Sequence, residues 1–104
     1  MEQQNSLHPK KKDELLTILA NHHRRIILNY FQNLSDNVAS IQDLAEEIIE
    51  QDNGGKKQVT LQLLHSTLPR LADVGAIEYD QRSNTVRYQG HSKLEMMMGS
   101  IANL

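Results

Sequence analysis

The chain has 104 residues, a formal net charge of −2, 38% hydrophobic residues and no cysteine. This length allows one domain, and the lack of cysteine excludes a disulfide scaffold, a thiolate nucleophile and any cysteine-ligated metal site. No apolar run approaches the roughly 18 residues of a membrane span, and the polar N-terminus does not resemble a secretory signal. We therefore expect a soluble, cytoplasmic protein that has no contact with a membrane.

The first third of the chain predicts a tail and two helices. Residues 1–12 form the expected flexible tail, because Pro9 and three lysines precede the first apolar pattern. A short helix is expected to begin at Asp13 and to end at Asn21. The next helix spans 22–34, and its apolar residues recur at helical spacing, which predicts one buried stripe. The stripe residues are Ile27, Tyr30, Phe31 and Leu34.

A third helix is expected from Ser40 to the Asn53-Gly54-Gly55 turn. Ser40 and Asp43 have the spacing of a capping box, which marks a helix start. Five apolar residues share one face, namely Ile41, Leu44, Ala45, Ile48 and Ile49. The opposite face is acidic, with Asp43, Glu46, Glu47 and Glu50. These carboxylates would repel phosphate, so we expect a solvated face that points away from any bound DNA.

A fourth helix is expected from about Lys56 to Val74, with a kink at Pro69 and a C-cap at Gly75. The spacing places five residues on the inner face, namely Leu61, Leu64, Leu68, Leu71 and Ala72. It places another five on the outer face, namely Val59, Gln62, Leu63, Ser66 and Arg70.

The apolar period then changes from 3.6 to 2, which predicts a β-hairpin from two strands at 76–80 and 85–88. Its inward residues are expected to be Ile77, Tyr79, Val86 and Tyr88. A last helix over 91–104 begins with a second capping-box spacing, Ser92 to Glu95.

This order predicts a mainly α protein with a small β-hairpin, an α+β class. A Gly-containing turn between the third and fourth helices is typical of a helix-turn-helix. A hairpin directly after that pair makes the arrangement a winged helix-turn-helix, which we expect over residues 13–90. In such a domain the fourth helix enters the major groove, and the wing, residues 76–89, touches the backbone or minor groove.

Two stretches carry a family resemblance. LTILANHHRRIILNYF resembles the opening of ArsR-like winged-helix regulators, where a short helix, a turn and an Arg-Arg pair precede an apolar helix. LHSTLPRLADVGAIEYDQRSNTVRY is similar to the recognition helix and wing of archaeal winged-helix proteins. The resemblance covers roughly residues 13–90 and implies a small, dimeric prokaryotic transcriptional regulator.

The expected partner is double-stranded DNA. Lys56 and Lys57 would contact phosphates at the start of the fourth helix. Side chains further along that helix would face the bases, because amides can bond adenine and apolar groups can meet a thymine methyl. These residues are Gln58, Val59, Thr60, Gln62, Ser66 and Arg70. In the wing, Arg82 and Arg87 are the candidates for backbone or minor-groove contact.

Each of these assignments has a plain alternative. The lysines can be solubilising charges, Val59 and Leu63 can pack on the N-terminal helix, and an exposed arginine is common on any hairpin. Arg24 and Arg25 can contact phosphate or can have a structural role.

The apolar residues of the last helix form a single stripe, which can be core or interface, and we expect it to form a homodimer contact. The expected dimerisation residues are Leu94, Met97, Met98, Ile101 and Leu104. A two-fold dimer would set two recognition helices about 34 Å apart, which is one turn of DNA.

Three rival functions stay open. The near-neutral charge and the acidic third helix favour a winged helix that binds another protein and not DNA. A switch that responds to a metal or a small molecule is the second rival. The five histidines form no recognised metal-ligand pattern, so we expect no metal and no cofactor. The third rival, an enzyme, is disfavoured, because no nucleophile elbow, phosphate loop or paired carboxylate site is visible.

Overall fold

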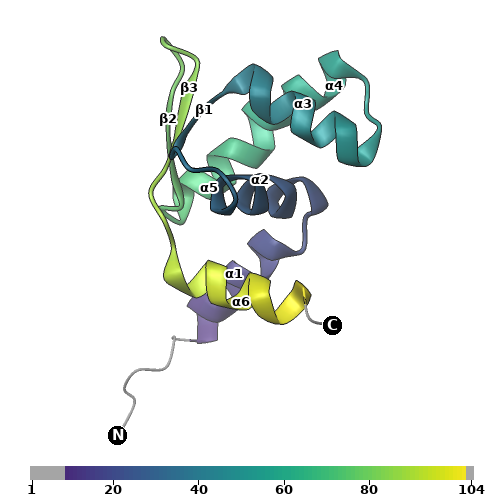
Figure 1. Ribbon diagram of the computed structural model, residues 1–104. Helices are drawn as coiled ribbons and strands as arrows, with labels where there is room; N and C mark the ends of the chain where they lie inside the picture. Colours follow the sequence, from purple (N-terminus) through teal and green to yellow (C-terminus); the bar gives the residue numbers. More distant parts are fainter. Residues whose placement is uncertain (1–8, 103–104) are drawn as a thin grey trace, which may run out of the picture.

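The computed structural model describes residues 9–102, with side chains placed for residues 10–100. The protein is mainly helical and has one small antiparallel sheet, so the predicted α+β class is confirmed (Figure 1). The elements are α1 (Pro9–Leu19), α2 (His22–Gln32), β1 (Val38–Ser40), α3 (Ile41–Asp52), α4 (Lys56–Gln62), the π-helical turn η1 (Leu63–Thr67), α5 (Leu68–Asp73), β2 (Ile77–Asp80), β3 (Thr85–Tyr88) and α6 (Ser92–Ala102). None of the described helices is long and apolar enough to cross a bilayer.

The sheet has three strands in the order β1-β3-β2, one more than the expected hairpin. Val86 of the central strand pairs with Ala39 on one side and with Tyr79 on the other. The additional strand β1 is only three residues long and ends where α3 begins. It fixes the hairpin to the helical layer, which a two-stranded hairpin alone would need for stability.

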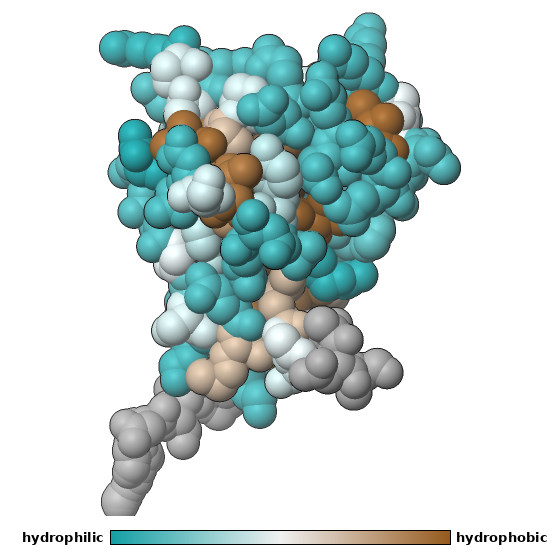
Figure 2. Space-filling model, in the orientation of Figure 1, coloured by the Kyte–Doolittle hydropathy of each residue, from teal (hydrophilic) through white to brown (hydrophobic). Residues whose placement is uncertain are grey.

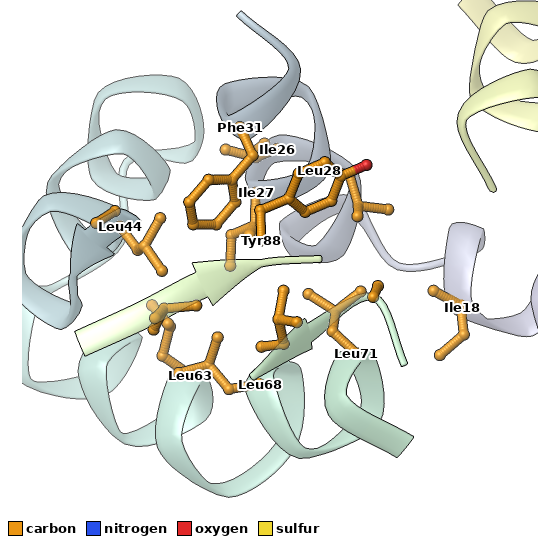
Figure 3. Close-up of a cluster of buried hydrophobic side chains, with 14 of the residues drawn as sticks. Ile18, Ile26, Ile27, Leu28, Phe31, Leu44, Leu63, Leu68, Leu71 and Tyr88 are labelled. Atoms are coloured by element: carbon orange, nitrogen blue, oxygen red, sulfur yellow. The ribbon is translucent and has the colours of Figure 1, made fainter. Parts of the chain in front are cut away.

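The core lies between the sheet, α2 and the segment from α4 to α5 (Figure 3). Ile77, Val86 and Tyr88 point inward as predicted, whereas Tyr79 is half-buried. The Tyr88 ring stacks on Phe31 with a centroid separation of 5.4 Å and an angle of 6°. This contact joins the central strand to α2.

The helix α1 begins at Pro9, four residues before the expected start at Asp13. The three lysines predicted to lie in a tail therefore belong to α1, and Pro9 occupies the first helical position, where its missing N–H is tolerated. The rest of the expected tail, residues 1–8, lies outside the described residues.

Asn21 begins α2 and does not simply end α1: its side-chain oxygen accepts a hydrogen bond from the Arg24 backbone N–H at 3.1 Å.

The Arg24-Arg25 pair has a structural role. The buried Arg24 guanidinium donates to the carbonyls of Thr17 and Ile18, and Arg25 donates to the carbonyl of Leu19 at 2.7 Å. These are the last carbonyls of α1, which no longer have partners within the helix. Burial, followed by the charge of Arg70, lowers the pKa of Arg24.

The capping box at the start of α3 is confirmed. The Ser40 hydroxyl accepts from the Asp43 backbone N–H at 3.0 Å, and the Asp43 carboxylate accepts from the Ser40 N–H at 3.4 Å. The predicted apolar face is buried, apart from the half-buried Ile49. Asn53 ends the helix in the left-handed region, with φ of 55°.

The expected fourth helix is interrupted by the π turn η1. The Leu68 backbone N–H bonds to the carbonyl of Leu63, five residues back, and α5 then starts with Pro69 in its first turn. Proline has no N–H to donate, so the π turn lies where the regular α-helical hydrogen-bond pattern is already interrupted.

The extra residue in the π turn also changes which side of α4 is buried. Val59 and Leu63 are 2% and 0% exposed, so the prediction that they point outward is wrong. Leu61, predicted to be buried, is 48% exposed. In a uniform helix, five residues turn about 500°, which would misalign Leu63 with Leu68. The π turn realigns them on one buried face, as Figure 3 shows.

The helix α6 is capped by His91 and not by the expected Ser92. The His91 Nδ1 accepts from the Leu94 backbone N–H at 3.3 Å, and Glu95 accepts from the His91 N–H at 3.4 Å. Leu94 is fully buried in the core of its own chain, so its assignment to a dimer contact is wrong. Met97 and Met98 pack partly against that core, whereas the side chain of Ile101 and all of Leu104 lie outside the described residues.

Candidate nucleic-acid interface

The start of α4 presents two cations. Lys56 and Lys57 are both exposed, and Gln58 beside them is exposed as well. The turn before them needs a glycine, because a Cβ on Gly54 would lie 2.5 Å from a methyl carbon of Val59. The buried Val59 thereby anchors the turn that presents the lysines to solvent.

The outward face of α4 differs from the predicted one. At about 100° per residue, the buried Val59 and Leu63 place Lys57, Gln58 and Leu61 on the opposite, exposed side. Val59 cannot reach a base, so its assignment to DNA contact is wrong. We call Lys57, Gln58, Leu61 and His65, which are all exposed, the α4 outer face.

Thr60 has less capacity for DNA contact than its position in the sequence predicted. It is half-buried, and its hydroxyl donates to the carbonyl of Lys56 at 2.8 Å. The hydroxyl proton is therefore committed to the helix backbone.

Gln62 and Ser66 are exposed but lie beside another element, not on the α4 outer face. They line a hollow of about 360 Å³ between the start of α2, the end of α3 and the segment formed by the end of α4 and η1. We call it the α2 hollow. Its lining residues are Asn21, His22, His23, Asp52, Gln62, Ser66 and Thr67.

Two histidines share one carboxylate in the α2 hollow. The Nε2 atom of His23 lies 2.9 Å from one Asp52 oxygen, and the Nε2 atom of His22 lies 3.9 Å from the other. This contact ties the first turn of α2 to the last residue of α3. No cluster of three or more His, Asp or Glu side chains within the described part of the chain is arranged to hold a metal ion.

Arg70 is not placed with the lysines. It lies on α5 about 20 Å along the helical segment from Lys56. There it lines a second hollow together with Glu14 and Thr17 of α1 and Asp73 of α5.

The hairpin holds one arginine at its tip and one on its flat face. Arg82 is exposed in the four-residue connection, and its backbone N–H donates to the Asp80 carboxylate at 3.0 Å. Arg87 is exposed on the central strand, directly opposite Glu78 of β2. Glu78 therefore gives Arg87 a carboxylate neighbour on the paired strand.

The hairpin tip is fixed to the start of α3 by Asn84. Its amide nitrogen donates to Gln42 at 2.9 Å, and its carbonyl accepts from the Ile41 N–H at 3.2 Å. Asn84 has φ of 60°, a conformation that asparagine tolerates better than most residues. Asn84 was not among the predicted site residues, although asparagine in a hairpin connection is a signal for this conformation.

Figure 1 places the start of α4 and the hairpin tip at the same end of the molecule, opposite the pair α1 and α6. The helix α3, which carries the acidic residues, lies between the hairpin and α4 in this view. Burial, followed by the charges of Asp43 and Glu47, raises the pKa of Tyr30 on α2. Two carboxylates of the acidic face, those of Asp43 and Glu47, therefore lie near α2.

Residues 16–87 match a family described as a domain of unknown function, DUF7344. The match covers more than half of the chain. The chain belongs to the DUF7344 family. No curated protein and no solved structure matches the chain.

The DUF7344 match contains every element of this interface. It begins within α1, includes the π turn and the α2 hollow, and ends at Arg87 in β3. The helix α6 lies beyond it. The match thus covers α4 and most of the hairpin but not α6.

Proposed function

We propose that this protein is a winged helix-turn-helix regulator of transcription that binds double-stranded DNA through α4 and the hairpin. The order α2-β1-α3-α4-η1-α5-β2-β3 supports this, because α3 and the helical segment from α4 to α5 are joined by a tight turn and followed by a hairpin. The third strand adds support, since it holds the hairpin beside the helix pair.

The observation that carries the proposal is the position of the exposed cations. Lys56 and Lys57 begin α4, Arg82 lies at the hairpin tip, and both sites are at the same end of the molecule. Phosphate neutralisation supplies most of the affinity of such an interface, so three exposed cations at one end of the molecule can contribute despite the net charge of −2.

Base recognition in this proposal falls to the α4 outer face. Gln58 can bond adenine through both of its amide atoms, and the exposed Leu61 can meet a thymine methyl. Gln62, Ser66 and Arg70 lie away from that face, as described above, so they have no base contact in this arrangement.

The experiment is a titration of labelled duplex at several salt concentrations. We expect log K to fall linearly with log[salt], and the double variant Lys56→Ala with Lys57→Ala to lower the slope by about 2. The matched control is Lys12→Ala with Lys93→Ala, which removes two charges from α1 and α6 and should leave the slope unchanged. A wild-type protein that does not bind duplex at low salt would rule the proposal out.

A protein-binding role is the second candidate. Leu61 is 48% exposed, and several carboxylates of α3 are also exposed, which suits a protein partner as well as a groove. Without duplex binding, Leu61 would be the first residue to test as an anchor for such a partner.

We further propose that the regulator acts as a homodimer through α1 and α6. These helices pack together, and they carry two of the large exposed apolar side chains, Leu16 at 46% and Met96 at 65%. Figure 2 shows moderately hydrophobic residues at this end of the molecule, whereas strongly hydrophobic patches lie among hydrophilic residues nearer the other end. A second copy of the chain would cover them, and light scattering measures whether it does.

A further inference from the structure

The α2 hollow is lined by a largely buried threonine whose hydroxyl has no hydrogen-bond partner among the described residues. Thr67 is 3% exposed and lines the hollow, yet its hydroxyl makes no hydrogen bond to any residue between 9 and 102. Threonine in a helix usually bonds back to the carbonyl four residues earlier. Thr17 and Thr60 do so at 2.9 and 2.8 Å. The π turn moves Thr67 out of that pattern and leaves its hydroxyl open to a ligand.

The same hollow lies at the N-terminus of an 11-residue helix. The backbone N–H groups of His22 and His23 in the first turn of α2 have no acceptor within the helix. The positive end of the helix dipole lies there, which favours an anion. The hydroxyl of Ser66 and the amide of Gln62 add donors from the opposite wall.

We propose that the α2 hollow binds one phosphate of the DNA backbone, beside the groove that α4 occupies. This inference rests on the proposed function. It reassigns Gln62 and Ser66 from base recognition to phosphate contact, and it adds Thr67 and the start of α2 to the interface.

Asp52 is the group in the hollow that opposes an anion. Its two oxygens face the Nε2 atoms of His23 and His22, at 2.9 and 3.9 Å. An Arg25 guanidinium nitrogen lies 3.4 Å from His22 Nδ1 and can donate to it, which leaves the proton of His22 on Nε2, toward Asp52. The carboxylate is therefore surrounded by donors, which reduces its repulsion of phosphate but does not remove it.

Two kinds of variant separate this site from a purely structural contact. Thr67→Val keeps the shape and removes the hydroxyl, and Ser66→Ala does the same at the exposed wall. Each should weaken binding about tenfold on every duplex sequence and leave the salt slope unchanged, because a neutral hydroxyl displaces no counterion. Asp52→Asn keeps a polar partner for His23 and should tighten binding roughly threefold to tenfold. Thr17→Val, on α1, is the control and should bind as wild type.

Stability provides a second readout. Because the Thr67 hydroxyl makes no hydrogen bond to the described residues, Thr67→Val should not unfold at a lower temperature than wild type, although it binds DNA more weakly. A residue with a purely structural role would change the melting temperature and leave duplex affinity unchanged.

The outcomes distinguish this inference from the proposed function. If wild-type protein does not bind duplex at low salt, both fail. If it binds, and Thr67→Val, Ser66→Ala and Asp52→Asn all bind as wild type, only the α2 hollow assignment is wrong. If inorganic phosphate shifts the amide NMR signals of His22 and His23 while those variants leave duplex affinity unchanged, the hollow takes free phosphate and the DNA assignment is overturned.

Discussion

The Tyr88 hydroxyl donates a hydrogen bond to the Glu95 carboxylate, which joins the last residue of β3 to the first turn of α6. The same carboxylate accepts from the backbone N–H of His91, the residue that caps α6. Glu95 therefore sets the direction in which α6 leaves the sheet. If α6 mediates dimerisation, this contact also fixes the orientation of the two hairpins relative to the dimer axis.

The Tyr88–Glu95 contact makes stability fall at alkaline pH. Burial, followed by the hydrogen bond to Glu95 and its charge, raises the pKa of Tyr88 well above the ordinary tyrosine value of about 10. Above pH 10 the unfolded chain loses this proton while the folded chain keeps it, so the unfolded state gains relative stability. We expect the free energy of unfolding to decline as pH rises from 10.

Tyr88→Phe removes the titrating group and tests this expectation in urea melts at pH 7 and above pH 10. At pH 7 the variant should be less stable by about 1.5–3 kcal/mol, because a hydrogen bond to a charged group is lost. The difference from wild type should shrink at alkaline pH. An equal difference in unfolding free energy between wild type and variant at both pH values would show that titration of Tyr88 does not cause the loss of stability.

The turn before α4 provides a matched pair of glycine variants. A Cβ at Gly54 would lie 2.5 Å from the stiff, buried side chain of Val59, whereas one at Gly55 would meet nothing within 4 Å. Gly54→Ala should therefore lower stability by about 1–3 kcal/mol. Gly55→Ala, at φ of −71°, should be neutral or should stabilise by up to about 1 kcal/mol. Thermal melts compare the two, and equal effects would contradict the proposed contact.

Local patterns predicted much of the fold. The capping box of Ser40 and Asp43 and the alternation around Val86 depend on neighbouring residues, so their spacing was sufficient. Strand β1 depends on pairing between Val38 and Arg87, which are far apart in the chain. With only three residues, it has no periodicity of its own to detect.

The candidate site was predicted less well, because two leucine patterns overlap in the fourth helix. Leu61, Leu64, Leu68 and Leu71 fit a uniform α-helix, and this pattern placed Val59 outside. In the structure, Leu63 and Leu68 lie on the same buried face because a π turn separates them. The spacing rules for regular helices do not predict such a turn. Pro69 was the available signal, since it indicates a disturbance of the hydrogen bonds before it. The α2 hollow depends on how α2 packs beside η1, so no local pattern predicts it.

The proposed homodimer can be tested at its two most exposed apolar residues. Leu16→Lys and Met96→Lys place charges on α1 and α6 at side chains that one copy of the chain leaves 46% and 65% exposed. If a second copy covers them, each variant should shift the mass measured by light scattering from dimer to monomer. Because both residues are exposed in the single chain, thermal stability of the monomer should change by less than about 0.5 kcal/mol.

Leu61→Lys is the matched control for these charges, because Leu61 is 48% exposed at the opposite end of the molecule. It should leave the mass unchanged. A wild-type mass of one chain at micromolar concentration would contradict the dimer.

Base preference distinguishes the α4 outer face from the α2 hollow. Gln58 lies on the outer face, one residue from Lys57, whereas Gln62 lines the hollow. Gln58→Ala should reduce discrimination at one base position by about 1–3 kcal/mol, because an amide pair with adenine is lost. Gln62→Ala should weaken all duplexes by a similar factor, because a phosphate contact carries no sequence information. Selection of binding sites from a random duplex library, made with each variant, measures both effects. The reverse pattern would place Gln62 at the bases and would mean that DNA approaches α4 from the side of α2.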